Sequence, residues 1–381
     1  LMFTLFLISF FYLTDISLYI CCALVGIGNG VFFSGHGGYL VEHSSRRTIE
    51  INSSLAIAVM AASSLLSGLV MLLTTSLTEG GHLANNTATD DGKDGGDEAY
   101  RIFSDAEIRY MYGAFALLSL GANVIFALLP SAVSLDSLRH AAAPKTRRTL
   151  GESLLLMARS MARRRMLLLA VFFCYLGVYN SFAVSIYPTS FAFTKSLSAN
   201  RFLPAYSWIA SGAADMTTGF TIHFLSRRIR HFGLFGTATV GCLVSAANFL
   251  LIFASTPNSA SMRPTDEAAP WIQPSITICL IISVLIGVAD SCVFNARNVI
   301  CALVLPGRTD QAFAINKFYQ SLIPVFFFFA SPQMSITAYF GILVGGLIFG
   351  GSLYFYVAIG IVKRERRVVT KVSSNETANS S

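Results

Sequence analysis

Residues 274–297 read PSITICLIISVLIGVADSCVFNAR and carry only two charged side chains, Asp290 and Arg297. A helix that crosses the ~30 Å hydrocarbon layer of a bilayer needs about 20 mainly apolar residues, which this stretch provides. Nine further stretches have the same character, namely 1–13, 17–40, 51–76, 108–130, 166–194, 204–225, 233–255, 311–331 and 335–362. The sequence therefore predicts an all-α, polytopic membrane protein with about ten spans.

The composition excludes a water-soluble protein. Hydrophobic residues make up 54% of the 381 residues and charged residues only 12%, whereas about 25% charged residues is usual in soluble domains. The seven cysteines lie within or at the ends of apolar stretches without a CxxC pair, so we expect neither disulfides nor a zinc site. The sequence has no HExxH, Walker A or GxSxG motif. We therefore expect no enzyme, no cofactor and no catalytic or metal-binding residue.

The basic residues predict how the chain is oriented in the membrane. Twenty of the 27 Lys and Arg residues fall in alternate loops, and such loops stay in the cytoplasm. With ten alternating spans, both ends of the chain are then cytoplasmic. The net charge of +7 thus lies beside membrane segments, which favours membrane lipids as partners and argues against nucleic acid. The choice between the plasma membrane and an internal membrane stays open.

Residues 77–107 are expected on the opposite, outer side of the membrane. The segment is acidic and rich in glycine, and it carries the sequon Asn85-Asn86-Thr87. Trp208 and Trp271 also fall at this outer boundary, where amphipathic rings prefer to lie. We therefore predict a glycosylated outer loop with Asn85 as the modified residue.

A long basic segment divides the spans into two groups. We expect residues 1–130 to be the remainder of an N-terminal transmembrane half, 131–165 a cytoplasmic linker, 166–362 a C-terminal half of six spans and 363–381 a cytoplasmic tail. Within the linker, Thr149–Arg165 has the pattern of an amphipathic helix whose arginines face anionic headgroups. Many transporters have two six-span halves, so this division predicts that two N-terminal spans are absent; a true ten-span protein is the alternative.

Charged groups inside the spans are candidates for function, because each costs ~2.5–3.5 kcal/mol near the membrane centre. Asp215 lies near the middle of its span, and Asp290 and Lys317 lie in the cytoplasmic halves of theirs. Because Asp290 and Arg297 share one helix face, we expect Asp290 to pair with Arg297 or Lys317. Such a pair ties two helices together, gates a conformational change or couples an ion, and these alternatives stay open. His36 is either a pH-sensitive group facing a cavity or a partner in a hydrogen bond between helices.

Four stretches resemble one known family. They are GIGNGVFFSGHGGYL at 26–40, IEINSSLAIAVMAASSLLSG at 49–68, MLLLAVFFCYLGVYNSFAVSIYPT at 166–189, and 287–332, which contains GVADSCVFN, QAFAINKFYQS and FFFFASP. Their order and spacing resemble the uncoordinated-93-like branch of the major facilitator superfamily over nearly the whole chain, which implies a bundle of twelve spans. Two polar residues of these stretches join the buried charges in one candidate intramembrane site, made of Asp215, Asp290, Asn295, Arg297, Lys317, Gln320 and His36.

The resemblance also implies a function. The first function that the resemblance implies is that of a regulatory subunit of potassium channels or a trafficking partner of other membrane proteins. Secondary transport of a small solute or ion by alternating access is the alternative for which this fold is built. Few polar groups face the predicted cavity, and Ala61 and Leu69 stand where relatives carry Gln and Asn. This apolar character favours the regulatory hypothesis.

Overall fold

The computed structural model describes residues 1–12, 14–86, 105–129, 137–138 and 149–379. These residues are nearly all helical, and they contain no strand beyond an isolated bridge between Thr194 and Thr265. This confirms the predicted all-α class. The expected outer loop 77–107 and linker 131–165 lie partly outside the described residues.

The helical elements follow one another along the chain. In order they are α1 (Met2–Ser9), α2 (Asp15–Glu42), α3 (Ile49–Asn86), α4 (Asp105–Ala127), α5 (Leu150–Met161), α6 (Arg164–Ser181), η1 (Phe182–Ile186), α7 (Tyr187–Phe193), α8 (Lys195–Ser198), α9 (Leu203–Arg228), η2 (Phe232–Gly236), α10 (Thr237–Ser255), η3 (Asn258–Ser261), α11 (Ile276–Val304), α12 (Thr309–Ala330), η4 (Ser331–Gln333) and α13 (Ile336–Asn379). The π-helical turn η1 continues α6 into α7, so these three elements form one membrane-length rod.

Eight of the described helices are long and apolar enough to cross a membrane, which confirms a polytopic membrane protein. Two of the ten predicted spans differ from this set. The helix α1 has 8 residues, a rise of ~12 Å that is short of the bilayer thickness. The helix α9 has 26 residues, or ~39 Å. It is long enough to span, but its serines, threonines and Asp215 make it more polar than the eight helices.

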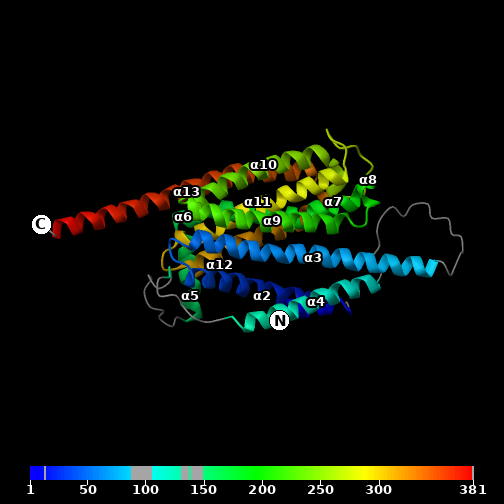
Figure 1. Ribbon diagram of the computed structural model, residues 1–381, viewed down its shortest axis with the longest axis horizontal. Coiled ribbons are helices and arrows are strands. Elements are labelled where there is room, and N and C mark those ends of the chain that lie inside the picture. Colours follow the sequence, from blue (N-terminus) through cyan, green and yellow to red (C-terminus); the bar gives the residue numbers. More distant parts are fainter. Residues whose placement is uncertain (13, 87–104, 130–136, 139–148, 380–381) are drawn as a thin grey trace.

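The long helices run side by side along the long axis of the molecule (Figure 1). We call α1–α4 the first helix group and α6–α13 the second helix group. The helix α5 lies across one end of the bundle, and the end of α13 leaves the bundle at that same end. At the opposite end, α3 projects beyond its neighbours (Figure 1). The two groups touch mainly where α3 packs on α9 and where α2 packs on α12.

The contact between α3 and α9 is made almost backbone to backbone. A Cβ atom at Gly212 would lie 2.5 Å from the Leu65 backbone nitrogen, and one at Gly68 would lie 2.8 Å from the Ile209 nitrogen. Small residues of this kind let membrane helices approach closely, and van der Waals packing then holds them together because lipid supplies no hydrophobic driving force. The glycines at positions 68 and 212 therefore determine how closely the two helix groups approach each other.

The helix α5 has the start that its sequence predicts. The Thr149 hydroxyl accepts a hydrogen bond from the Glu152 N–H (3.3 Å), and the Glu152 carboxylate accepts one from the Thr149 N–H (3.0 Å). This reciprocal pair satisfies two backbone donors at the helix start. The Ser160 hydroxyl donates to Gln311 Oε1 (2.7 Å) and ties α5 to α12. Within the stretch Thr149–Arg165, α5 covers Leu150–Met161 and α6 begins at Arg164.

Filling the α3–α9 contact should separate the helix groups. We expect Gly212→Val to destabilise the protein by roughly 1–3 kcal/mol, because the added side chain overlaps the α3 backbone. Thermal unfolding of the purified protein, followed by size-exclusion chromatography, measures this change. A matched control is Gly121→Val in α4, where a Cβ atom meets nothing within 4 Å. Equal stability of the two variants would contradict the role assigned to this contact.

Candidate functional site

An open groove lies between α2 and α12, one helix from each group. Its volume is ≈ 610 Å³. The lining is small and mixed in polarity, and consists of Gly26, Asn29, Gly30, Ser34, Ala314, Lys317, Phe318, Ser321 and Leu322. Next to the groove, the Phe313 ring fills the space over Gly37, where even a Cβ atom would overlap it. The groove thus ends where α2 and α12 come into direct contact.

Lys317 is the charged residue of this groove. Its Nζ atom lies 3.9 Å from the centre of the Phe33 ring, a cation–π contact between α12 and α2. Within the described part of the chain, Lys317 forms no ion pair with a carboxylate. A cation–π contact stabilises a desolvated ammonium by about 2 kcal/mol, and a charge in the membrane costs ~2.5–3.5 kcal/mol. Phe33 therefore offsets most of the cost of this charge.

Arg297 does not pair with Asp290 as the sequence predicted. Its Nε and Nη2 atoms donate to Asn298 Oδ1 at 3.2 and 2.8 Å, and its guanidinium carbon lies 4.7 Å from the centre of the Phe294 ring. Seven residues of helix separate Asp290 from Arg297 by ~10.5 Å along the axis, whereas Asn298 is adjacent. No ion pair joins Asp290 to Arg297 or Lys317 among the described residues, so this prediction is wrong.

Asp215 and Asp290 lie together where α9 packs on α11. A Cβ atom at Gly287 would overlap the α9 backbone, so the helices are in close contact there. The Ser291 hydroxyl donates to the Asp215 carbonyl (3.0 Å) across the same contact. Among the described residues, one carboxylate oxygen of each Asp is buried without a hydrogen-bond partner. The structure thus brings together two predicted site residues of the second helix group.

The remaining predicted residues are spread over three places. His36 is half-buried on α2 with its ring stacked on Phe32 (6.2 Å between centres). Gln320 is buried on α12 beside α6. The Asn295 amide donates to the Gly233 carbonyl (3.1 Å), near the end of the bundle.

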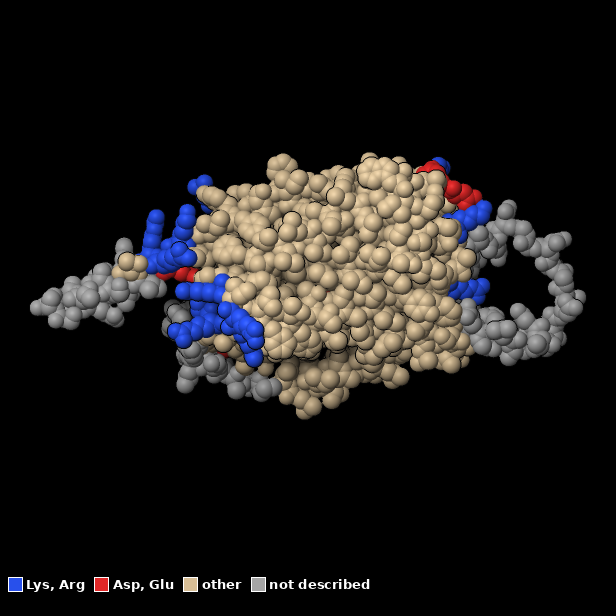
Figure 2. All heavy atoms as spheres, turned by 45° about the horizontal axis from the view of Figure 1, so that its top comes forward, with Lys and Arg blue, Asp and Glu red and all other residues tan. Residues whose placement is uncertain are grey.

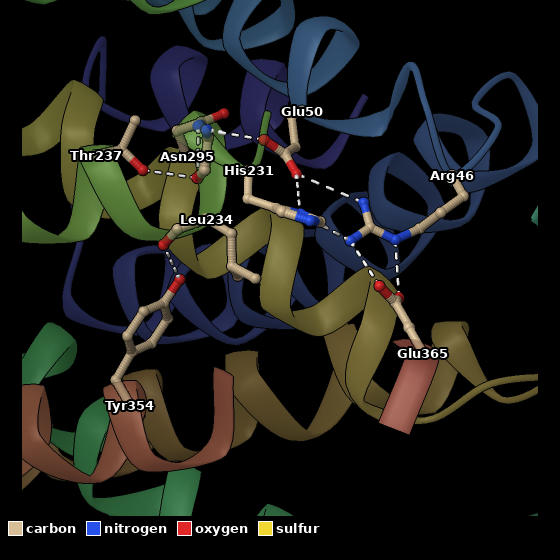
Figure 3. Close-up of polar contacts among 9 residues, drawn as sticks. Arg46, Glu50, His231, Leu234, Thr237, Asn295, Tyr354 and Glu365 are labelled. Carbon is tan, nitrogen blue, oxygen red and sulfur yellow. Dashed lines mark hydrogen bonds and ion pairs between the residues drawn. The ribbon is translucent and has the colours of Figure 1, made fainter. Parts of the chain in front are cut away.

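A second polar cluster joins the two helix groups at the end of the bundle where α5 lies. The Arg46 guanidinium donates to both carboxylate oxygens of Glu365 (2.8 and 3.0 Å) and to Glu50 Oε1 (3.4 Å) (Figure 3). The other Glu50 oxygen accepts from the Gly233 N–H (2.8 Å), and His231 Nδ1 lies 3.8 Å from Glu50. We call these five residues, Arg46, Glu50, His231, Gly233 and Glu365, the interlock.

The interlock rests on neutral hydrogen bonds beneath it. The Gly233 carbonyl accepts from the Thr237 hydroxyl (2.6 Å) as well as from Asn295, and the Tyr354 hydroxyl donates to the Leu234 carbonyl (2.9 Å). These bonds connect η2 to α11 and α13 (Figure 3). Pairs as exposed as Arg46–Glu365 stabilise a protein by only about 0.2–1 kcal/mol. Glu50 is nearly buried, and removing a partner from such a charge costs on the order of 3 kcal/mol.

Sequence reasoning missed the interlock. Two weak signals pointed to it: Glu50 is an acid at the start of an apolar span, and Glu365 is the single acid in the basic run KRERR. Exposed Lys and Arg side chains surround this end of the molecule (Figure 2), including Arg47, Arg164, Arg228 and Lys363. We therefore call it the basic end.

Comparisons with known proteins agree with the resemblance found in the sequence. A family profile described as "Ion channel regulatory protein UNC-93" matches residues 1–355. UNC93-like protein MFSD11 of Xenopus tropicalis is 26% identical over 365 residues, which cover 92% of this chain and 77% of the relative. The Xenopus laevis protein of the same name is 25% identical over 363 residues, covering 91% and 76%. These matches confirm the predicted uncoordinated-93-like family.

A solved structure with the same fold is that of the major facilitator superfamily proton:xylose symporter XylE bound to 6-bromo-6-deoxy-D-glucose. It superposes with a TM-score of 0.58 at 14% sequence identity, over 95% of this chain and 78% of the symporter. At this identity the likeness concerns the fold alone. The predicted major facilitator bundle is confirmed.

The interlock should weaken in acid. Burial, followed by the charge of Arg46, lowers the pKa of His231 from its ordinary value of 6.5, against the opposing charge of Glu50. The unfolded chain then binds more protons than the folded one, so stability falls as the pH drops below the unfolded value. We expect the unfolding temperature in nanodiscs to fall more between about pH 7.5 and 5.5 in the unmodified protein than in His231→Asn.

The substitution His231→Asn preserves the backbone conformation at this position. His231 has a φ of 59°, in the left-handed region that Asn tolerates. His43→Asn, at the end of α2, is the matched control and should keep the full response to pH. The same fall in unfolding temperature for His231→Asn and the unmodified protein would refute the role of His231.

Proposed function

Because the chain belongs to the UNC-93 family and has the major facilitator fold, we propose that it is a non-enzymatic membrane protein that moves a small solute or ion by alternating access. In this proposal residues 1–130 and 166–362 form the two halves. They rock against each other about the close contact of α3 with α9. The groove between α2 and α12 is then the place where the solute binds.

One observation carries the proposal: the two helix groups are closed at the basic end and open in the middle. The interlock joins α3 to α13 and η2 at the basic end. Slightly farther in, Phe313 packs directly on Gly37. Beyond that contact the groove opens between Ser34 and Ala314. A bundle that is shut at one end and has an open groove between its two helix groups fits one state of an alternating-access cycle.

The buried charges supply groups that respond to a solute or ion. Lys317 faces the groove, and Asp215 and Asp290 lie together without a compensating ion pair in the described part of the chain. Ionisable groups within membrane helices mark ion or substrate pathways in many transporters. In our proposal Lys317 binds the solute, and the two carboxylates change protonation during the cycle.

A second candidate function follows from the family description, which names ion channel regulation. The protein would then act on a potassium channel, or on the trafficking of another membrane protein, through its outward helix faces. Large apolar side chains such as Phe326, Phe329 and Phe349 are exposed on α12 and α13. In a membrane such side chains contact lipid or a partner helix equally well.

Transport should depend on opening the interlock. In a variant with Cys21 and Cys22 replaced by Ser, we introduce Arg46→Cys and Glu365→Cys and join them with a reversible thiol cross-linker. We expect proteoliposomes with this variant to take up at least one solute of a labelled library. Cross-linking should then remove at least about 90% of this uptake, and reduction of the cross-linker should restore it. The single variant Arg46→Cys, treated identically, is the control.

Two outcomes would count against this proposal. Uptake that persists after complete cross-linking would exclude alternating access at the basic end. Failure of every solute, combined with altered current when the protein is co-expressed with two-pore-domain potassium channels in oocytes, would favour the regulatory candidate instead.

We further propose that the basic end faces the cytoplasm. Exposed Lys and Arg side chains gather there (Figure 2), and short basic loops are retained on that side. The exposed leucines Leu154 and Leu155 of α5 would then rest against the inner leaflet, where anionic headgroups attract the neighbouring arginines. Because α13 runs back to the basic end, the C-terminus is cytoplasmic in this orientation.

The same orientation predicts glycosylation at Asn85. The helix α3 starts at the basic end and extends for 38 residues to Asn86, a length of ~57 Å that exceeds the bilayer. Asn85 therefore lies beyond the opposite end of the bundle. We expect N-glycosidase treatment to increase the mobility of the protein from human cells and to have no effect on Asn85→Gln. Asn379→Gln is the control, and loss of the shift in that variant would reverse the proposed orientation.

A further inference from the structure

We propose that the groove between α2 and α12 takes an amphiphilic organic anion: a carboxylate or phosphate group on an apolar body, with Lys317 as its counter-charge. This names the class of ligand for the groove, and it rests on the proposed function only for the claim that the bound anion is also transported. The binding itself follows from the groove's shape, charge and unused hydrogen-bonding groups.

The lining of the groove is divided by polarity. Lys317, Ser321, Asn29 and Ser34 supply polar groups, and the remaining lining residues are apolar or are glycines. Phe318 is 45% exposed and Leu322 39% exposed, so both present apolar surface to the open side of the groove. Pockets that hold amphiphilic ligands combine an apolar wall with a few polar groups that fix the charged part.

The charge of the groove is positive and has no acid to balance it. No Asp or Glu is among the lining residues, and within the described part of the chain the partner of the Lys317 ammonium group is the Phe33 ring. Among the described residues no ion pair joins Lys317 to Asp290 or to another carboxylate, so an anion in the groove would supply this lysine with a negative partner.

The hydrogen-bonding groups of the groove are also unused. In the neighbouring helices α3 and α9, hydroxyls such as those of Ser63, Ser67 and Thr217 donate to a backbone carbonyl of the preceding turn. Within the described residues the side chains of Asn29, Ser34 and Ser321 make no such bond, although they line the groove. Carboxylate and phosphate oxygens accept hydrogen bonds from amide and hydroxyl donors, and a charged acceptor makes these bonds stronger.

Two sources provide this ligand chemistry. A soluble organic acid would enter the groove through its open side, and an anionic phospholipid would place its headgroup against Lys317 with its chains along the exposed apolar wall. Both require the same contacts, so the lysine is decisive in either case. The experiment therefore includes one arm for each source.

The first arm uses the full chain purified in nanodiscs of neutral phosphatidylcholine. The probes are 4-phenylbutyrate, 4-phenylbutan-1-ol and 4-phenylbutylamine, which share one apolar body and differ in charge. We expect saturable binding of 4-phenylbutyrate, and binding of the alcohol and the amine that is weaker by at least about tenfold. This comparison needs no variant, so it tests the proposal even if a substitution impairs folding.

Variants then identify the residue responsible. Lys317→Met should weaken 4-phenylbutyrate binding by at least about tenfold, because it removes the only charge that faces the ligand. Lys317→Arg should keep most of the affinity, and Lys317→Glu should reverse the preference toward 4-phenylbutylamine. The control is Arg263→Met, which removes an exposed positive charge in the loop after η3 and should bind as the unmodified protein does.

The second arm replaces part of the phosphatidylcholine with phosphatidylglycerol. Competition with 4-phenylbutyrate in the unmodified protein, absent in Lys317→Met, would support the same site with a lipid as its natural ligand. Absence of competition, with 4-phenylbutyrate still bound, would support a soluble acid. Equal binding of the three phenylbutyl probes, or unchanged affinity in Lys317→Met, would overturn the proposal.

The proposal and the transport function fail in different ways. Binding of 4-phenylbutyrate that depends on Lys317, without uptake of any labelled anion by proteoliposomes, leaves the anion site standing and removes transport. Uptake of an uncharged solute by protein that does not bind 4-phenylbutyrate leaves transport standing and removes the anion site.

Discussion

The close approach of α3 and α9 is the constraint on which the rest of the structure depends. At Gly68, Gly212 and Gly219 there is no room for a side chain between the two helices. In a membrane, where helices gain no hydrophobic energy by associating, such tight packing supplies the attraction. It also fixes the position of the start of α3, so that Glu50 reaches the backbone of η2.

Closure of the basic end follows from that position. With α3 held against α9, the turn before it places Arg46 between Glu50 and Glu365. The first and second helix groups are thereby tied at a point far from the middle of the bundle. Closer to the middle, α2 and α12 meet at Gly37 and Phe313 and then separate around the groove. One contact between helices thus leads to both the closed end and the open centre.

The two positive charges within the membrane, Arg297 and Lys317, are accommodated by neutral neighbours rather than by carboxylates. Arg297 uses the adjacent Asn298 and the ring of Phe294, and Lys317 uses the ring of Phe33. Sequence reasoning identified both charges as unusual but assigned them the wrong partners, because opposite charges on one helix face suggested a pair. The ring of Phe33 belongs to another helix, and no local pattern in the sequence connects it to Lys317. An unbalanced lysine therefore became visible only in the folded chain.

The sequence by itself determined the class of the protein, its family and most of the spans. Runs of about 20 apolar residues are local properties, because each membrane helix satisfies its own backbone hydrogen bonds. The exceptions were α1, which has 8 residues, and α9, which is more polar than the other long helices. Only the tertiary structure decided the interlock and the groove. Arg46 and Glu365 stand 319 positions apart in the chain, and such a pair forms only after packing between distant helices has fixed their separation and orientation.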